Sequence, residues 1–268
     1  MTAAEVALTA TFRRFWKNWA TILSLRQVAD VAIPIAAQPL SAIHRDFVDQ
    51  LSVDPQYKKI IVNLDGSEAT WDDDTKNLLR TAMTAGVMTS AKAAIDAASL
   101  VFAHSVLDDS AWSYLRVCAI ACPADWEPII AEKKVSFADL GRSLDAIRHE
   151  MIREKIERME RESLLKKVDL LFQLCRPPKD YAPVNDYVYD RGRLEKIDDA
   201  RNGIIHKDGI GKALDDIEDD LDFIRKTANY LLALVNRRYG VQVVATLGPL
   251  PPEDFDGKAI EENSPHMR

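Results

Sequence analysis

Apolar side chains recur every three or four positions along most of the chain, which is the spacing of one face of an α-helix. The pattern is clearest over residues 214–235. Its apolar positions there are Leu214, Ile217, Leu221, Ile224, Ala228, Leu231 and Val235. Such a seam is stable when it packs against other helices. The pattern predicts an all-α, mainly helical protein, and the presence of only 10 glycines argues against a β fold with many tight turns.

The N-terminal region carries a second helical pattern over residues 4–30. Large apolar side chains fall on one side of this predicted helix: Leu8, Phe12, Phe15, Trp19, Ile22 and Leu23. Pro34 and Pro39 then interrupt the pattern, because a proline inside a helix removes a backbone hydrogen bond. Residues 40–51 therefore predict a second, shorter helix.

The middle of the chain returns to a helical pattern after a short apolar run. Residues 57–64 predict a strand before an Asp-Gly turn. A helical pattern follows over about 72–121, with a break expected near Gly86. Pro123 and Pro128 then predict the end of this segment.

A long charged helix is predicted over about 143–175. Its buried stripe consists of Ile152, Ile156, Met159, Val168, Leu171 and Leu174. Residues 176–189 contain three prolines and no helical period, so they predict a loop. A helix over about 190–207 follows and ends before Gly209, and the acidic, proline-rich tail of 240–268 is expected to be disordered.

These elements divide the chain into three regions. Residues 1–85 are a helical region of unknown role, 86–239 form a helical bundle, and 240–268 form the tail. Whether the first two regions are one domain or two is left open by the pattern.

Charge and composition restrict the functions that the chain can have. The formal net charge is −7, so a broad basic surface for nucleic acid is excluded, and RNA binding would need a local patch. Three cysteines give no disulfide framework, and Cys118 and Cys122 are interpreted as buried thiols on a helix. No phosphate-binding glycine loop, serine nucleophile motif or metal-ligand set occurs, so neither a metal nor another cofactor is expected.

The N-terminus does not resemble a secretory signal. Arg13, Arg14 and Lys17 fall where an uninterrupted apolar run would be required. No segment reaches the roughly 20 apolar residues of a membrane span. We therefore expect a cytoplasmic protein without a membrane partner.

Polar residues with catalytic potential gather near the end of the predicted 190–207 helix. Its apolar stripe is formed by Leu194, Ile197, Ile204 and Ile205. Arg201 falls inside that sector, where a guanidinium is unfavourable unless it meets an acid, lines a cleft or faces a partner. Asn202 and His206 are four apart and share an adjacent face. Arg can neutralise a phosphate and His can transfer a proton at a ribose hydroxyl, which are the groups that metal-free RNA cleavage requires.

The segment Arg201-Asn202-x-x-x-His206 resembles the Arg-x(4–6)-His motif of the HEPN superfamily, including the polar residue after the arginine. The surroundings are similar too: a helix leads into the motif, a glycine follows, and a strongly periodic helix comes last. The stretch ESLLKKVDLLFQLCRPP with its Tyr- and Asp-rich loop is also similar to bacterial members. The resemblance covers roughly 86–239.

This resemblance implies a four-helix bundle that forms a homodimer, with two motifs facing one cleft. It implies metal-independent endoribonuclease activity that leaves cyclic phosphate ends, and a toxin-like role in defence or stress response. His206 would be the general acid or base, Arg201 would stabilise the phosphate, and Asn202 would orient the site. His104 is a candidate supporting residue beside this cluster. An antitoxin or other regulator is not identified, since Asp208 stands where toxins of this group carry a tyrosine.

Other patterns compete with this interpretation. Arg142 and His149 satisfy the same loose motif, and on an ideal helix Arg201 and His206 point about 140° apart. Their convergence requires either a loosened helix or a second subunit. The acids of 215–219 spell a DDxxD diphosphate-binding motif, but they are interpreted as the acidic first turns of the last helix.

Two alternatives to the ribonuclease remain open. The first is a catalytically inactive HEPN-like bundle that binds RNA or acts as a scaffold. The second is an all-helical domain with no link to RNA.

Overall fold

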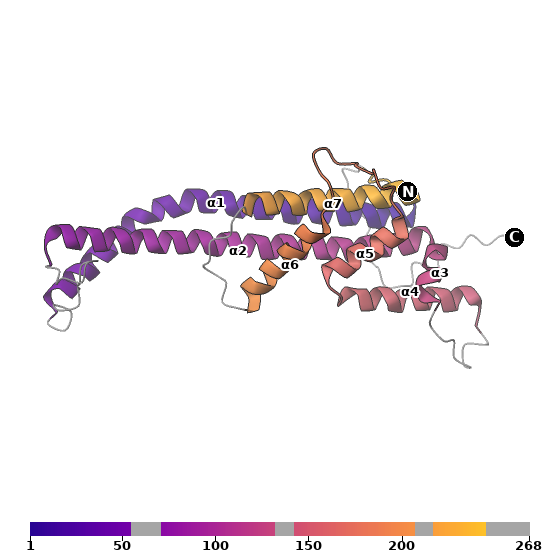
Figure 1. Cartoon of the computed structure of the whole chain (residues 1–268), viewed down its shortest axis with the longest axis horizontal. Coiled ribbons are helices and arrows are strands. Elements are labelled where there is room, and N and C mark those ends of the chain that lie inside the picture. Colours follow the sequence, from indigo (N-terminus) through magenta and orange to yellow (C-terminus); the bar gives the residue numbers. More distant parts are fainter. Residues whose placement is uncertain (55–70, 132–141, 207–216, 245–268) are drawn as a thin grey trace. The chain divides into compact units, whose positions relative to one another are not determined.

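The computed structural model describes residues 1–54, 71–131, 142–206 and 217–244, and all regular structure within these ranges is helical (Figure 1). The elements are α1 (Ala3–Val53), α2 (Asp73–Ala121), the 3-10 helix η1 (Pro123–Trp126), α3 (Glu127–Ile130), α4 (Leu144–Glu160), α5 (Leu164–Cys175), α6 (Arg191–His206) and α7 (Ile217–Tyr239). The predicted all-α class is confirmed.

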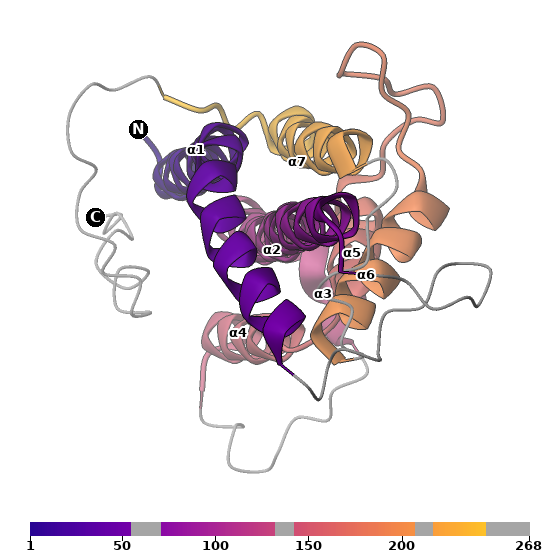
Figure 2. The same ribbon diagram turned by 90° about the vertical axis from the view of Figure 1, so that its left-hand side faces the viewer.

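Helix α1 differs from its prediction, because it continues through both Pro34 and Pro39. The two separate helices predicted over 4–30 and 40–51 are therefore one. Each proline lacks the N–H that would bond to the preceding turn, but the flanking bonds keep the helix intact. Figures 1 and 2 show that α1 changes direction in its second half, as expected for a helix with internal prolines.

Helix α2 likewise has no break at Gly86, where an added Cβ would meet nothing within 4 Å. The single helix predicted over 143–175 is wrong, because the structure has two helices there, α4 and α5. The predicted stripe residues of both helices are nevertheless buried. A continuous helix would turn the stripe of α5 about 90° away from that of α4, so the break lets both stripes face the core.

The C-terminal half follows the predicted order of elements. Residues 176–189 form a loop with left-handed backbone at Arg176 and Asp186, and α6 and α7 follow it. The start of the tail is packed, since Val241 is buried and the backbone N–H of Val244 donates to Oγ1 of Thr9. The strand predicted at 57–64, Leu214, Gly209 and the tail beyond 244 lie outside the described residues.

The chain divides into two compact units that share three helices. The first unit contains residues 1–15, 110–183 and 231–268, and the second contains 16–109 and 184–230. Helices α1, α2 and α7 contribute to both. The predicted domain boundary at residues 85 and 86 falls inside α2.

In the second unit α1 and α2 are antiparallel. Residues later in α1 contact residues earlier in α2. Arg26 pairs with Asp96 at 2.6 Å, and Nδ1 of His44 lies 2.9 Å from Oγ1 of Thr84. Figure 2 shows α2 between α1 and α6, with α7 alongside. The buried core of this unit includes Trp19, Ile22, Leu100, Leu107, Leu194, Ile197, Leu221 and Ile224.

The first unit is closed by polar contacts around a second core. Arg238 on α7 makes two hydrogen bonds of 2.8 Å to the Asp125 carboxylate. The Tyr181 hydroxyl donates to the Ala233 carbonyl at 2.9 Å. Trp126, the last residue of η1, is fully buried. The buried core of this unit also includes Leu8, Tyr114, Leu115, Cys118, Leu164, Val168, Leu171 and Val235.

Candidate functional site

The RNxxxH motif occupies the last turn and a half of α6, in the second unit. Leu194, Ile197 and Ile204 are buried, as their predicted stripe requires. Ile205 was predicted to join that stripe, but it is 43% exposed. Arg201 is half-buried, so this guanidinium does lie at the edge of the apolar face.

The Arg201 guanidinium has few partners within the described part of the chain. Its Nη1 donates to Oδ1 of Asn202 at 2.8 Å, which makes Asn202 a neighbour that orients the arginine. Its Nε is buried and has no hydrogen-bond partner among the described residues. No described carboxylate forms an ion pair with it, and the Asn202 amide is neutral. A half-buried positive charge of this kind favours a bound anion.

His206 is exposed and is the last residue of α6. The helix is regular through Gly203, so no loosening between Arg201 and His206 occurs before the helix ends. Two residues five positions apart on a regular helix point about 140° from each other. Within the described part of α6 these two side chains therefore do not meet on one phosphate.

His104, the candidate supporting residue, lies on α2 beside α6. Its Nε2 is 2.8 Å from Oδ1 of Asp198, and the two side chains are 6% and 19% exposed. The geometry at Nε2 falls short of a well-directed hydrogen bond, so the pair is a close polar contact. Asp198 is one turn before Arg201 on α6.

The surroundings of His104 favour its neutral form. Burial lowers the pKa of His104 below its ordinary value of 6.5. The negative charges of Asp198 and Asp108 oppose this shift, whereas the positive charge of Arg201 adds to it. Arg201 therefore lies close enough to His104 for its positive charge to oppose protonation of the imidazole.

Asp198 was missed by the sequence analysis. Its position three residues before Arg201 was a usable signal, because such pairs share one face of a helix. Nothing in the sequence, however, indicated that a histidine more than 90 positions earlier would contact it. That contact depends on how α6 packs on α2.

The second match to the motif lies in different surroundings. Arg142 precedes α4, its side chain is 41% exposed, and it pairs with Glu150. His149 is exposed on α4. Because Arg142 is solvated and already neutralised by a carboxylate, this pair lacks the free half-buried charge that marks Arg201.

The cysteines have no evident chemistry at this site. Cys118 on α2 is buried in the first unit, where burial and the neighbouring Cys175 thiol raise its pKa. A thiol with a raised pKa is a poor nucleophile. The described residues contain no group of three or more His, Cys, Asp or Glu side chains placed to hold a metal ion.

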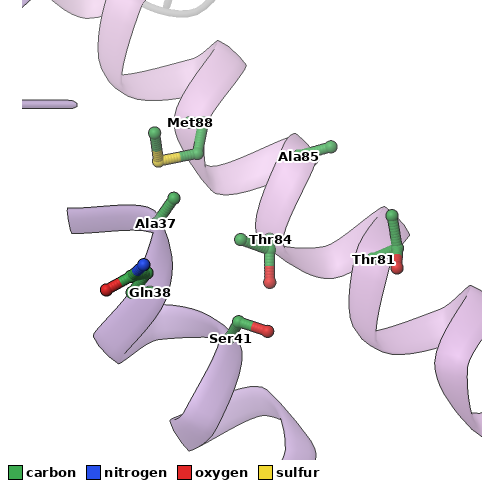
Figure 3. A pocket seen from close by; sticks show the side chains of 7 residues that line it. All are labelled: Ala37, Gln38, Ser41, Thr81, Thr84, Ala85 and Met88. Atoms are coloured by element: carbon green, nitrogen blue, oxygen red, sulfur yellow. The ribbon is translucent and has the colours of Figure 1, made fainter. Parts of the chain in front are cut away.

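A hollow of about 400 Å³ lies between α1 and α2 in the second unit (Figure 3). Its lining residues are Ala37, Gln38, Ser41, Thr81, Thr84, Ala85 and Met88. No charged side chain lines it, and none of the motif residues contributes to it. We assign it no catalytic role.

Helices α1 and α2 are long and apolar enough to cross a membrane by length and composition alone. Only 17% and 28% of their most apolar stretches are buried. The expectation that no segment would be long and apolar enough to span a membrane is therefore not met. Each helix also carries charges that pair with the other, such as Arg26 with Asp96.

The acids of the DDxxD pattern are only partly described. Asp219 lies in the first turn of α7, where a negative charge offsets the helix dipole as predicted. Asp215 and Asp216 lie outside the described residues.

Comparison with known proteins adds no identification. No protein-family model, no curated protein and no solved structure matches this chain. The function must therefore be argued from the α6 cluster itself.

Proposed function

We propose that this chain is a metal-independent endoribonuclease of the HEPN type, acting in the cytoplasm in defence or stress response. The observation that carries the proposal is the Arg201 guanidinium. It is half-buried, it contacts the neutral Asn202 amide, and within the described residues no carboxylate neutralises it. A phosphodiester is an anion that this group can bind through two parallel hydrogen bonds.

The proposed chemistry needs one proton acceptor and one anion site. His206 removes the proton from a ribose 2′-OH, whose oxygen attacks the adjacent phosphorus. Arg201 stabilises the charge that builds on the phosphate oxygens. The bond from phosphorus to the 5′ oxygen then breaks, that oxygen receives a proton, and the products carry a cyclic phosphate and a 5′-hydroxyl.

The direction of the side chains bears on how the site is assembled. Because Arg201 and His206 diverge on a regular α6, we propose that Arg201 of one protomer works with His206 of its partner. A two-fold dimer would then contain two equivalent sites. The exposure of His206 supports this arrangement, since an exposed side chain at a helix end is free to face another subunit.

The test is incubation of the purified protein with labelled single-stranded RNA in EDTA. His206→Ala should reduce cleavage by about 10²- to 10⁴-fold, because it removes general acid–base catalysis. Arg201→Ala should reduce it by about 10²- to 10³-fold, because it removes one stabiliser of the developing charge. Arg142→Ala and His149→Ala are matched controls, and both should cleave RNA like the wild type.

Loss of cleavage in the control variants, or unchanged cleavage in both α6 variants, would contradict the proposal. Circular dichroism on each variant separates lost chemistry from lost folding. EDTA in the assay excludes a contaminating nuclease that depends on divalent metal ions as the source of activity.

A non-catalytic RNA-binding protein is the second candidate. The divergence of Arg201 and His206 favours it, since a lone Arg201 can still bind phosphate without a proton acceptor nearby. RNA binding that weakens in Arg201→Ala, with no cleavage in the wild type, would identify this function instead.

A further inference from the structure

Asp198 and Arg201 occupy a spacing at which an acid and a base ordinarily pair on a helix. Of the three other Asp-x-x-Arg pairs whose residues the structure describes, two form ion pairs. Asp145 pairs with Arg148 at 2.9 Å on α4, and Asp222 pairs with Arg225 on α7. In the third, Asp190 accepts from the backbone N–H of Arg193, and the Arg193 guanidinium pairs with Asp220. Asp198 and Arg201 form no such pair, although α6 is regular between them.

The Asp198 carboxylate is instead directed to His104. Their 2.8 Å contact joins α2 to α6, and it is more buried than the exposed Asp145 and Asp222 pairs. The groups known to act on His104 are Asp198, Asp108 and Arg201. Asp198 makes a contact of 2.8 Å with His104, so His104 removes from Arg201 the carboxylate one turn before it on α6.

We propose that His104 is a positioning residue that holds Asp198 away from Arg201 and so keeps the guanidinium available to a phosphate. The proposal rests on the proposed function only in naming phosphate as the ligand. Without His104, Asp198 would turn to Arg201 and form the kind of pair that Asp145 forms with Arg148 and Asp222 forms with Arg225. An internal carboxylate would then compete with phosphate for the same N–H groups.

The decisive variants are His104→Ala and the double variant His104→Ala/Asp198→Asn. The single variant should bind single-stranded RNA about fivefold more weakly, the upper range for one ion pair near a surface. The double variant should recover wild-type affinity, because the neutral amide that replaces the carboxylate cannot neutralise Arg201. A purely structural role for His104 predicts the reverse, since the second substitution would remove a further contact.

Chemical modification gives a readout that needs no RNA. Phenylglyoxal reacts with free guanidinium groups, and its rate at Arg201 is followed by peptide mass spectrometry. The rate should fall in His104→Ala and recover in the double variant. His104→Gln, whose amide offers an N–H to the Asp198 carboxylate, should react like the wild type. His44→Ala, a control on α1 whose contact is with Thr84, should do so too.

Each outcome has a defined meaning. An unchanged Arg201 rate in His104→Ala overturns the inference, and so does a fall that the double variant does not reverse. If His104→Ala fails to fold, a fall in the His104→Gln variant overturns it, and wild-type reactivity there supports it. If the modification pattern holds but the wild type binds no RNA, the proposed function fails while the role of His104 stands.

Discussion

At the scale of single residues, the chemistry depends on the charge balance around Arg201. Arg201 is held by Asn202, and Asp198, the acid one turn before it on α6, is turned toward α2. His104 is kept neutral mainly by burial, although two carboxylates act in the other direction. The site is therefore prepared for an anion, because the protein itself supplies none to Arg201 among the described residues.

The lowered pKa of His104 predicts a pH-dependent stability. Unfolded His104 takes up a proton near pH 6.5, whereas the folded residue resists protonation, so protonation favours the unfolded chain. This contribution is fully present above about pH 6.5 and is lost as the pH falls below it. The free energy of unfolding, measured by urea denaturation, should fall between about pH 7.5 and 5.5, and it should fall less in His104→Gln. An equal decrease in both proteins would contradict this role of His104, since most carboxyl groups titrate below about pH 5.

At the scale of helices, the sequence pattern located the segments better than their ends. Apolar spacing predicted the stripes of α4, α5 and α7, and these residues are buried. Neither Pro34 nor Gly86 ends a helix, so the local preference against these residues inside helices did not predict the helix ends. The break between α4 and α5 has no proline or glycine, and its only signal was the changed direction of the apolar stripe after Met159.

The internal prolines of α1 predict that this helix can be stabilised. Pro34 and Pro39 are exposed, so alanine there would remove little packing and would restore a backbone hydrogen bond. Each of Pro34→Ala and Pro39→Ala should raise the free energy of unfolding, by up to about 3 kcal/mol. Urea denaturation measures this change. Pro178→Ala in the loop is the control of opposite sign, with an expected loss of about 0.4–1 kcal/mol, because proline there restricts the unfolded chain. A loss of stability in both α1 variants would mean that the prolines are needed for the bend.

At the scale of the molecule, the proposed site could be predicted only in part. The motif identified Arg201, Asn202 and His206, and the apolar period placed Arg201 at a buried edge. The contact between His104 and Asp198 could not be predicted, because it depends on α2 and α6 meeting in the second unit. The division of α1, α2 and α7 between two units could not be predicted either, because the spacing of apolar residues does not indicate which helices pack together.

The two-chain site makes a prediction that a single-chain site cannot make. Arg201→Ala and His206→Ala each damage both sites of a homodimer that contains only that variant. In a mixed dimer, both substitutions fall in one site and the other site keeps an intact Arg201 and His206. Mixed dimers of the Arg201→Ala and His206→Ala chains are therefore expected to regain part of the RNA-cleaving activity that each variant alone lacks.

Co-expression of these two variants, followed by an RNA cleavage assay in EDTA, tests the central claim most directly. Random pairing makes about half of the dimers mixed, each with one working site of two, so about a quarter of wild-type activity is expected. The control co-expresses Arg201→Ala with the Arg201→Ala/His206→Ala double variant, which should restore nothing. A mixture no more active than either variant alone, or a wild type that does not cleave RNA, would contradict the account.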